Sequence, residues 1–98
     1  MAESEDRLYR FGLGPELVSE LAAQAAEAES LGLPHGVSTF SRSGRPDAAS
    51  ALRTEAEKHF RVHKTGRNPY HYTIELPKPV TDEVTALFNE LFGRTGTA

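Results

Sequence analysis

Residues 59–76 decide the fold, and they read His59-Phe60-Arg61-Val62-His63-Lys64-Thr65-Gly66-Arg67-Asn68-Pro69-Tyr70-His71-Tyr72-Thr73-Ile74-Glu75-Leu76. Glycine, asparagine and proline in the middle favour a reversal of the chain. Apolar and polar residues alternate on both sides of that turn, as they do in strands that bury one face. The stretch therefore predicts two strands joined in a hairpin, with one apolar and one polar face.

The apolar residues set the expected pairing of the two strands. They are all even-numbered: Phe60, Val62, Tyr72, Ile74 and Leu76. With Val62 opposite Tyr72, three polar pairs face each other on the other side: His63 with His71, Arg61 with Thr73, and His59 with Glu75. A shift of the register by two residues would keep both faces but change these partners.

The rest of the chain predicts three helices and one further strand. A helix is expected from residue 15 to about 30, a strand at 35–41, and a second helix from about 46 or 47 to 58. Thr81 is a good cap for a third helix, which carries the cleanest amphipathic stripe: Val84, Leu87, Phe88, Leu91 and Phe92.

The resulting order is α-β-α-β-β-α, which predicts an α+β domain. Its sheet should be small, three-stranded and mainly antiparallel, with the helices packed on one face. Residues 1–14 are expected to form a flexible acidic lead-in, residues 15–94 the domain, and residues 95–98 a tail.

Length and composition exclude several classes of protein. The chain has 98 residues, which suits one domain, and it has no cysteine, which excludes disulfides and thiolate metal sites. There is no run of 18 apolar residues and no signal-peptide pattern at the acidic N-terminus, so no membrane association is expected. A cytoplasmic protein is the default expectation, and a secreted or delivered effector is the alternative.

The net charge of −3 hides an asymmetry along the chain. Residues 1–41 hold seven acidic and two basic residues, whereas residues 42–71 hold seven basic and three acidic residues together with three histidines. Residues 72–98 are acidic again. A basic middle in an acidic chain suits the focusing of an anion on one site, rather than the coating of a long nucleic acid.

The polar face of the hairpin carries the groups that metal-free phosphodiester chemistry requires. Histidine titrates near neutrality, so His63 and His71 could serve as base and acid, and no cofactor is needed. Arg61 could stabilise charge on phosphorus and Thr73 could bond a phosphoryl oxygen. Supporting roles fall to His59 and Glu75. The reaction would be cleavage of RNA by attack of the 2′-OH; alternatively, the residues form an ordinary solvated face.

Other residues are candidates for holding the substrate. They are cationic, aromatic or near the hairpin: Lys64, Arg67, Tyr70, His35, Arg42 and Arg45. Residues 42–45 precede an expected helix, whose N-terminus could help to bind a phosphate. No metal site is expected, because on a strand His59 and His63 would lie roughly 13 Å apart.

The stretch from His35-Gly36-Val37-Ser38 through His71-Tyr72-Thr73-Ile74-Glu75-Leu76-Pro77 to Phe92-Gly93 resembles small C-terminal ribonuclease domains of bacterial polymorphic and contact-dependent toxins. The resemblance implies a ribonuclease that acts on tRNA or similar RNA, and a cognate immunity protein as partner. Such toxins are usually more basic than this chain and are carried on larger delivery proteins. The alternative is a noncatalytic protein-binding module of the immunity, antitoxin or regulatory type, with its acidic first helix facing a basic partner.

Overall fold

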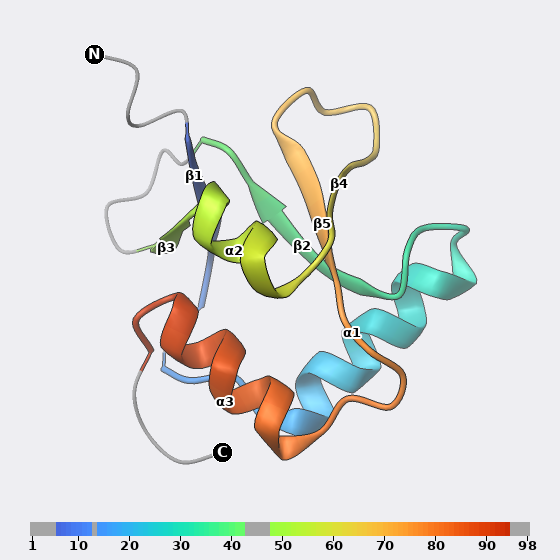
Figure 1. The fold of residues 1–98 in the computed structure, drawn as a ribbon. Coiled ribbons are helices and arrows are strands. Elements are labelled where there is room, and N and C mark those ends of the chain that lie inside the picture. The colour runs from blue at the N-terminus through green and yellow to red at the C-terminus, as the bar shows by residue number, and fades with distance from the viewer. Residues whose placement is uncertain (1–5, 13, 43–47, 95–98) are drawn as a thin grey trace.

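A computed structural model of the protein describes residues 6–12, 14–42 and 48–94. Within these residues it contains three helices and five strands (Figure 1). In chain order they are β1 (Arg7–Arg10), α1 (Val18–Ser30), β2 (Gly36–Phe40), β3 (Ala49–Leu52), α2 (Arg53–His59), β4 (Val62–Lys64), β5 (His71–Glu75) and α3 (Asp82–Leu91). The expected α+β class is confirmed, whereas the order of elements differs in detail.

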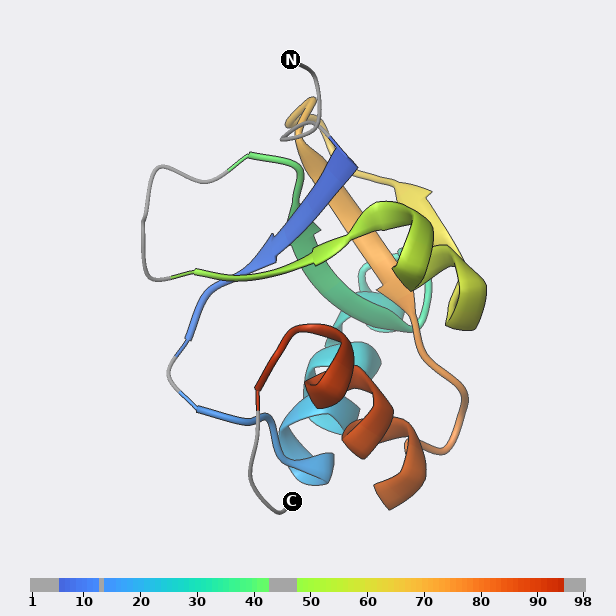
Figure 2. The same ribbon diagram turned by 60° about the vertical axis from the view of Figure 1, so that its left-hand side comes forward.

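The strands form one antiparallel sheet in the order β3-β1-β2-β5-β4. The described residues therefore form two more strands than the three that the sequence predicts. β1 and β2 share only the pair Tyr9 and Phe40, and they diverge beyond it. Figures 1 and 2 show α1 below β2 as drawn, with α3 beside it and α2 in front of the strands in Figure 1.

The first missed strand, β1, lies in the segment expected to be a flexible lead-in. It pairs with β3 over four residues and with β2 at one, so it is an interior strand. Leu8 is fully buried in the core. The end of this segment is thus ordered by the sheet, while residues 1–5 lie outside the described part of the chain.

The second missed strand, β3, falls in the expected helix at 46–58. Alanine favours helices intrinsically, but Ala49 and Ala51 pair with β1, and Ala51 is buried there. Tertiary pairing overrides local propensity at this point, so the helix begins only at Arg53 and ends at His59. Of the phosphate site expected at residues 42–45, only Arg42 is among the described residues, and the next described element after it is β3.

The first helix begins at Val18 rather than at Pro15, and Glu16 before it bonds α3. The Glu16 N–H donates to Asn89 Oδ1 at 2.8 Å, and Asn89 Nδ2 donates to the Glu16 carbonyl at 2.9 Å. The buried Glu16 carboxylate accepts from Arg10 at 2.8 and 2.9 Å and from Arg94 at 3.3 Å. These bonds tie the entry of α1 to β1 and α3.

Burial lowers the pKa of the Arg94 guanidinium; Glu16 opposes that change and Arg10 reinforces it. The Glu16 carboxylate therefore offsets the repulsion between the closely spaced, buried guanidinium groups of Arg10 and Arg94. A carboxylate paired in this way is expected to matter far more for folding than one on the surface.

The hydrophobic core lies between the sheet and the helices. As the alternation predicts, Ile74 and Leu76 are buried on the apolar side of the hairpin, with Phe60 beside them. The helices contribute Leu21, Ala56, Phe88 and Phe92. The expected cap of α3 is confirmed, since Thr81 Oγ1 accepts from the Val84 N–H at 3.2 Å.

Candidate functional site

The register of the hairpin differs from the expected one by two residues. Val62 lies opposite Ile74, His63 opposite Thr73, and Lys64 opposite Tyr72. The polar and apolar faces are preserved, but the predicted cross-strand pairs were wrong: His63 does not face His71, and Arg61 does not face Thr73. Because the apolar residues are all even-numbered, they are compatible with Val62 opposite either Tyr72 or Ile74. The loop selects between these two registers.

The loop between β4 and β5 is longer than expected because of its own hydrogen bonds. Asn68 Oδ1 accepts from the Tyr70 N–H at 2.8 Å, which is an asparagine turn, and Gly66 adopts a φ of 73° that favours glycine. Lys64 Nζ donates to the Asn68 carbonyl at 2.8 Å. These bonds lie in the turn at residues 66–70, next to the Thr65 N–H, which still donates to the His71 carbonyl at 3.2 Å.

The polar side of β2, β5 and β4 forms three rows of facing residues, which we call the histidine face. Each row has one residue from or beside each strand: Gly36, Glu75 and Arg61; Ser38, Thr73 and His63; Phe40, His71 and Thr65. Facing residues have Cα atoms roughly 4.5–5.5 Å apart. His63 and His71 are diagonal neighbours, for which the separation is roughly 7–8 Å.

His63 is held by Glu75. Its Nε2 lies 2.8 Å from Glu75 Oε1, and the two side chains are 35% and 42% exposed. Within the described residues, no hydrogen bond occupies the other ring nitrogen, Nδ1. A carboxylate at this distance accepts a hydrogen bond from the ring and orients it. The arrangement leaves Nδ1 available to a ligand on the surface of the sheet.

His71 is held at both ring nitrogens. Nδ1 lies 3.1 Å from the Thr65 carbonyl and 2.9 Å from Thr65 Oγ1, and Nε2 lies 2.9 Å from Ser38 Oγ. The carbonyl can only accept, whereas the Thr65 hydroxyl can donate or accept, so these contacts suit a ring that carries its proton on Nδ1. In that neutral tautomer Nε2 accepts from the Ser38 hydroxyl and is placed to act as a base.

Thr73 forms the floor between the two histidines. It is 1% exposed, and its Oγ1 lies 2.7 Å from Thr65 Oγ1. The Thr73 hydroxyl is thus bonded to Thr65 and does not face solvent. The expected contact with a phosphoryl oxygen would require an exposed hydroxyl. Thr73 shapes the site and fixes Thr65, which in turn orients His71.

Four expected substrate-binding residues lie around the turn end of the hairpin: Lys64, Arg67, Tyr70 and Arg42. Lys64 lies on the opposite face, where its Nζ bonds loop carbonyls and stands 5.9 Å from the Tyr72 ring. Tyr70 is 38% exposed and has the Arg42 guanidinium 4.8 Å from its ring centroid. Arg67 is exposed in the loop. Of these residues, none joins the three rows of the histidine face.

The remaining candidates are dispersed. His35 Nδ1 lies 3.0 Å from the Leu76 carbonyl, one residue before β2, so it supports the strand pairing. Arg45 falls outside the described residues. Arg61 is exposed beside Glu75, whose N–H donates to the Arg61 carbonyl at 2.8 Å. The structure thus joins His63, His71, Thr73, Glu75 and Arg61 on one face and separates the other candidates from it.

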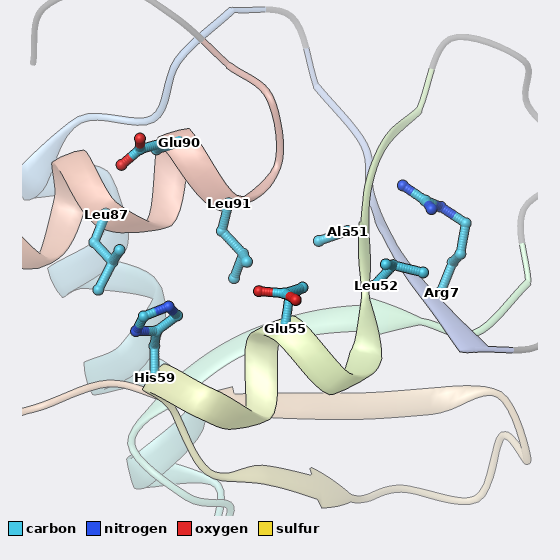
Figure 3. A pocket seen from close by; sticks show the side chains of 8 residues that line it. All are labelled: Arg7, Ala51, Leu52, Glu55, His59, Leu87, Glu90 and Leu91. Atoms are coloured by element: carbon cyan, nitrogen blue, oxygen red, sulfur yellow. The ribbon is translucent and has the colours of Figure 1, made fainter.

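His59 does not face Glu75, because α2 extends through it. It lies instead at a cavity of about 520 Å³ bounded by α2, α3 and the β1–β3 edge. Figure 3 shows the side chains that line it: Arg7, Ala51, Leu52, Glu55, His59, Leu87, Glu90 and Leu91. The cavity has an apolar floor with charged groups at its rim, and it is separate from the histidine face.

Sequence reasoning missed three residues of the site: Ser38, Phe40 and Thr65. Ser38 and Thr65 hold His71, and the Phe40 ring meets the His71 ring edge-on at 5.3 Å between centroids. The alternation in residues 35–41 placed Ser38 and Phe40 on one side of a strand. What the sequence lacked was a signal that this strand pairs with β5, which is the pairing that brings them to His71.

The described residues hold no group of three or more histidine and acidic side chains arranged to bind a metal ion. In the same part of the chain, no helix has the length and apolar character needed to cross a bilayer. No family model, curated protein or solved structure matches this chain. Function is therefore inferred from the chemistry of the side chains.

Proposed function

We propose that the histidine face cleaves RNA without a metal, by attack of the 2′-OH on the adjacent phosphate. The observation that carries the proposal is the pair of differently held histidines: His71 Nε2 lies 2.9 Å from the Ser38 hydroxyl, and His63 Nε2 lies 2.8 Å from Glu75 Oε1. They lie diagonally across Thr73. A base and an acid on one surface are what this reaction requires.

His71 is the general base in this proposal. Its Nε2 is bonded to the Ser38 hydroxyl at 2.9 Å, and the 2′-OH of the substrate takes the place of that hydroxyl. Thr65 keeps the ring in the required tautomer through its carbonyl. Loss of the 2′-OH proton to Nε2 yields the nucleophile, and a 2′,3′-cyclic phosphate forms.

His63 is the general acid. The carboxylate of Glu75 stabilises the imidazolium, and Nδ1 faces the substrate side because Nε2 is occupied. That proton passes to the departing 5′-oxygen. Arg61 lies in the row of Glu75 and is exposed, so its guanidinium can stabilise charge that develops on the phosphoryl oxygens.

The test uses purified protein, total bacterial RNA and EDTA, with single variants of each histidine. His63→Gln and His71→Gln should each lower the cleavage rate by roughly 10²–10⁴-fold, the usual range for an acid or base. His59→Gln is the matched control, since His59 is exposed but lies off the face. Mass spectrometry should find 2′,3′-cyclic phosphate ends. Intact RNA, or equal cleavage by all variants, would remove the proposal.

A second candidate is a noncatalytic protein-binding module, which the cavity between α2 and α3 favours. Leu52 is 40% exposed at its edge, and Leu87 and Leu91 line it. Such a function would survive loss of both face histidines and would fail when Leu52 is replaced by glutamate. Binding to a defined partner, measured by calorimetry with these variants, separates the two functions.

A further inference from the structure

We propose that Ser38 is a nucleophile activated by His71, and that it accepts short acyl groups from activated esters. This activity goes beyond RNA cleavage, because it uses neither the 2′-OH of a substrate nor His63. It rests on the contacts of Ser38 and on a cavity that begins at this residue.

The first observation is the alignment of three groups. Ser38 Oγ lies 2.9 Å from His71 Nε2, and the opposite ring nitrogen lies 3.1 Å from the Thr65 carbonyl. With the Nδ1 proton donated to this carbonyl, Nε2 can take the serine proton. A nucleophile, a base and a group that orients the base are the arrangement by which hydroxyl side chains become reactive. Ser38 is exposed, as attack on a substrate requires.

The second observation is a cavity of about 270 Å³ beside Ser38, between α1 and β2. Its lining is mixed: Ala28, Leu31, Leu33 and Val37 are apolar, whereas Gln24, Glu27 and Ser38 itself are polar or charged. A site of this size can take a short acyl chain against its apolar residues, and Glu27 disfavours an anionic one. The chain would lie against α1 while its carbonyl carbon approaches Ser38 Oγ.

The third observation concerns the groups around the reacting carbonyl. Arg10 Nη1 donates to the Ser38 carbonyl at 2.7 Å, which fixes the backbone of β2 where β1 has diverged. Arg10 Nη2 donates to Gln24 Oε1 at 3.2 Å. This bond occupies the acceptor of the Gln24 amide and leaves its N–H groups as donors at the cavity, where they can stabilise a developing oxyanion.

The reaction balances without any other reagent. The Ser38 hydroxyl proton passes to His71 Nε2 as the Oγ–carbon bond forms, and the carbonyl oxygen becomes an oxyanion. When the intermediate collapses, the bond between the carbonyl carbon and the leaving oxygen breaks. His71 returns its proton to that oxygen, which departs as an alcohol or phenol. Water then hydrolyses the acyl-serine with His71 as base.

The experiment follows p-nitrophenolate release from p-nitrophenyl butyrate, together with the intact mass of the full chain. We expect a burst equal to the protein concentration and one butyryl group on the peptide that contains Ser38. Ser38→Ala should abolish the burst, and His71→Gln should slow it by roughly 10²–10⁴-fold. Ser19→Ala, an exposed serine on α1, is the matched control. Circular dichroism confirms that each variant is folded.

A label that persists in Ser38→Ala, or that maps to lysine, would overturn the proposal. So would equal rates for esters from acetyl to dodecanoyl, because the cavity predicts a preference for short chains. Acylation of Ser38 without RNA cleavage would remove the proposed function and leave this inference standing. Cleavage of RNA without acylation would do the reverse.

Discussion

Replacement of Glu16 by glutamine should be the most damaging single change of charge in the described residues. The carboxylate is 6% exposed and accepts two bonds from Arg10 and one from Arg94. Glutamine has nearly the same shape, but it offers one acceptor and turns an N–H₂ group toward arginine donors. Removal of one partner of a buried ion pair costs about 3–5 kcal/mol, because the remaining charges stay buried.

The expected loss of unfolding free energy is large for a domain of this size. Small domains unfold with a free energy of about 5–15 kcal/mol, so the variant should lose roughly a fifth of its stability or more. The midpoint of thermal unfolding should fall by at least roughly 12 °C, since 1 kcal/mol corresponds to about 4–8 °C in a short chain. Urea titration and thermal circular dichroism measure the two quantities.

Glu57→Gln is the matched control for this experiment. Glu57 also pairs with an arginine, since its Oε2 lies 3.3 Å from Arg53 Nε, but it is 47% exposed. Surface pairs of this kind contribute about 0.3–0.5 kcal/mol, so its loss should be small. The effect of Glu16→Gln should also persist in 1 M salt, which screens exposed pairs far more than buried ones. Equal losses for the two variants would refute the reasoning.

Three further changes test other parts of the structure. Gly36→Ala should destabilise the fold by about 1–3 kcal/mol in urea, because the new Cβ would stand 2.0 Å from the Ile74 carbonyl oxygen and push β2 from β5; an unchanged midpoint would contradict this. Phe88→Ala should cost about 3–5 kcal/mol, as Phe88 is fully buried, and a loss under about 1 kcal/mol would argue against its central place. The hydrogen bond from Lys78 lowers the pKa of Glu29, so its contribution to stability is present above the ordinary glutamate pKa and is lost as pH falls through the lowered one. Lys78→Gln should raise that pKa in an NMR titration, and an unmoved titration would show that the pairing is not formed in solution.

The hairpin shows what alternation in a sequence can and cannot specify. The even-numbered apolar residues correctly predicted the buried side of each strand. Ile74 and Val62 lie on that side, as expected. The partners did not follow, because a shift of two residues keeps every side chain on its face. The interactions that accompany the observed register, such as the Asn68 turn, lie in the loop between the two strands.

β1 and β3 were missed for a different reason. Arg10 ends β1 and is buried, which is unusual for arginine and becomes favourable only when Glu16 is beside it. Ala49 and Ala51 carry a local preference for helix, and only their pairing with β1 makes them a strand. Both strands depend on contacts between distant segments, which local patterns do not encode. The same holds for Ser38, which reaches His71 only through the pairing of β2 with β5.

The bonds between Glu16 and α3 determine when this chain can fold. Asn89 bonds Glu16 across 73 positions of sequence, and Arg94 reaches the Arg10 carbonyl across 84. Contacts of such high order slow folding, because a long loop must close before any of them forms. On the ribosome, β1 and the entry of α1 have no partners for these groups until residues 89–94 have emerged. A nascent chain that stops short of α3 therefore lacks the Asn89 and Arg94 partners of Glu16 and Arg10.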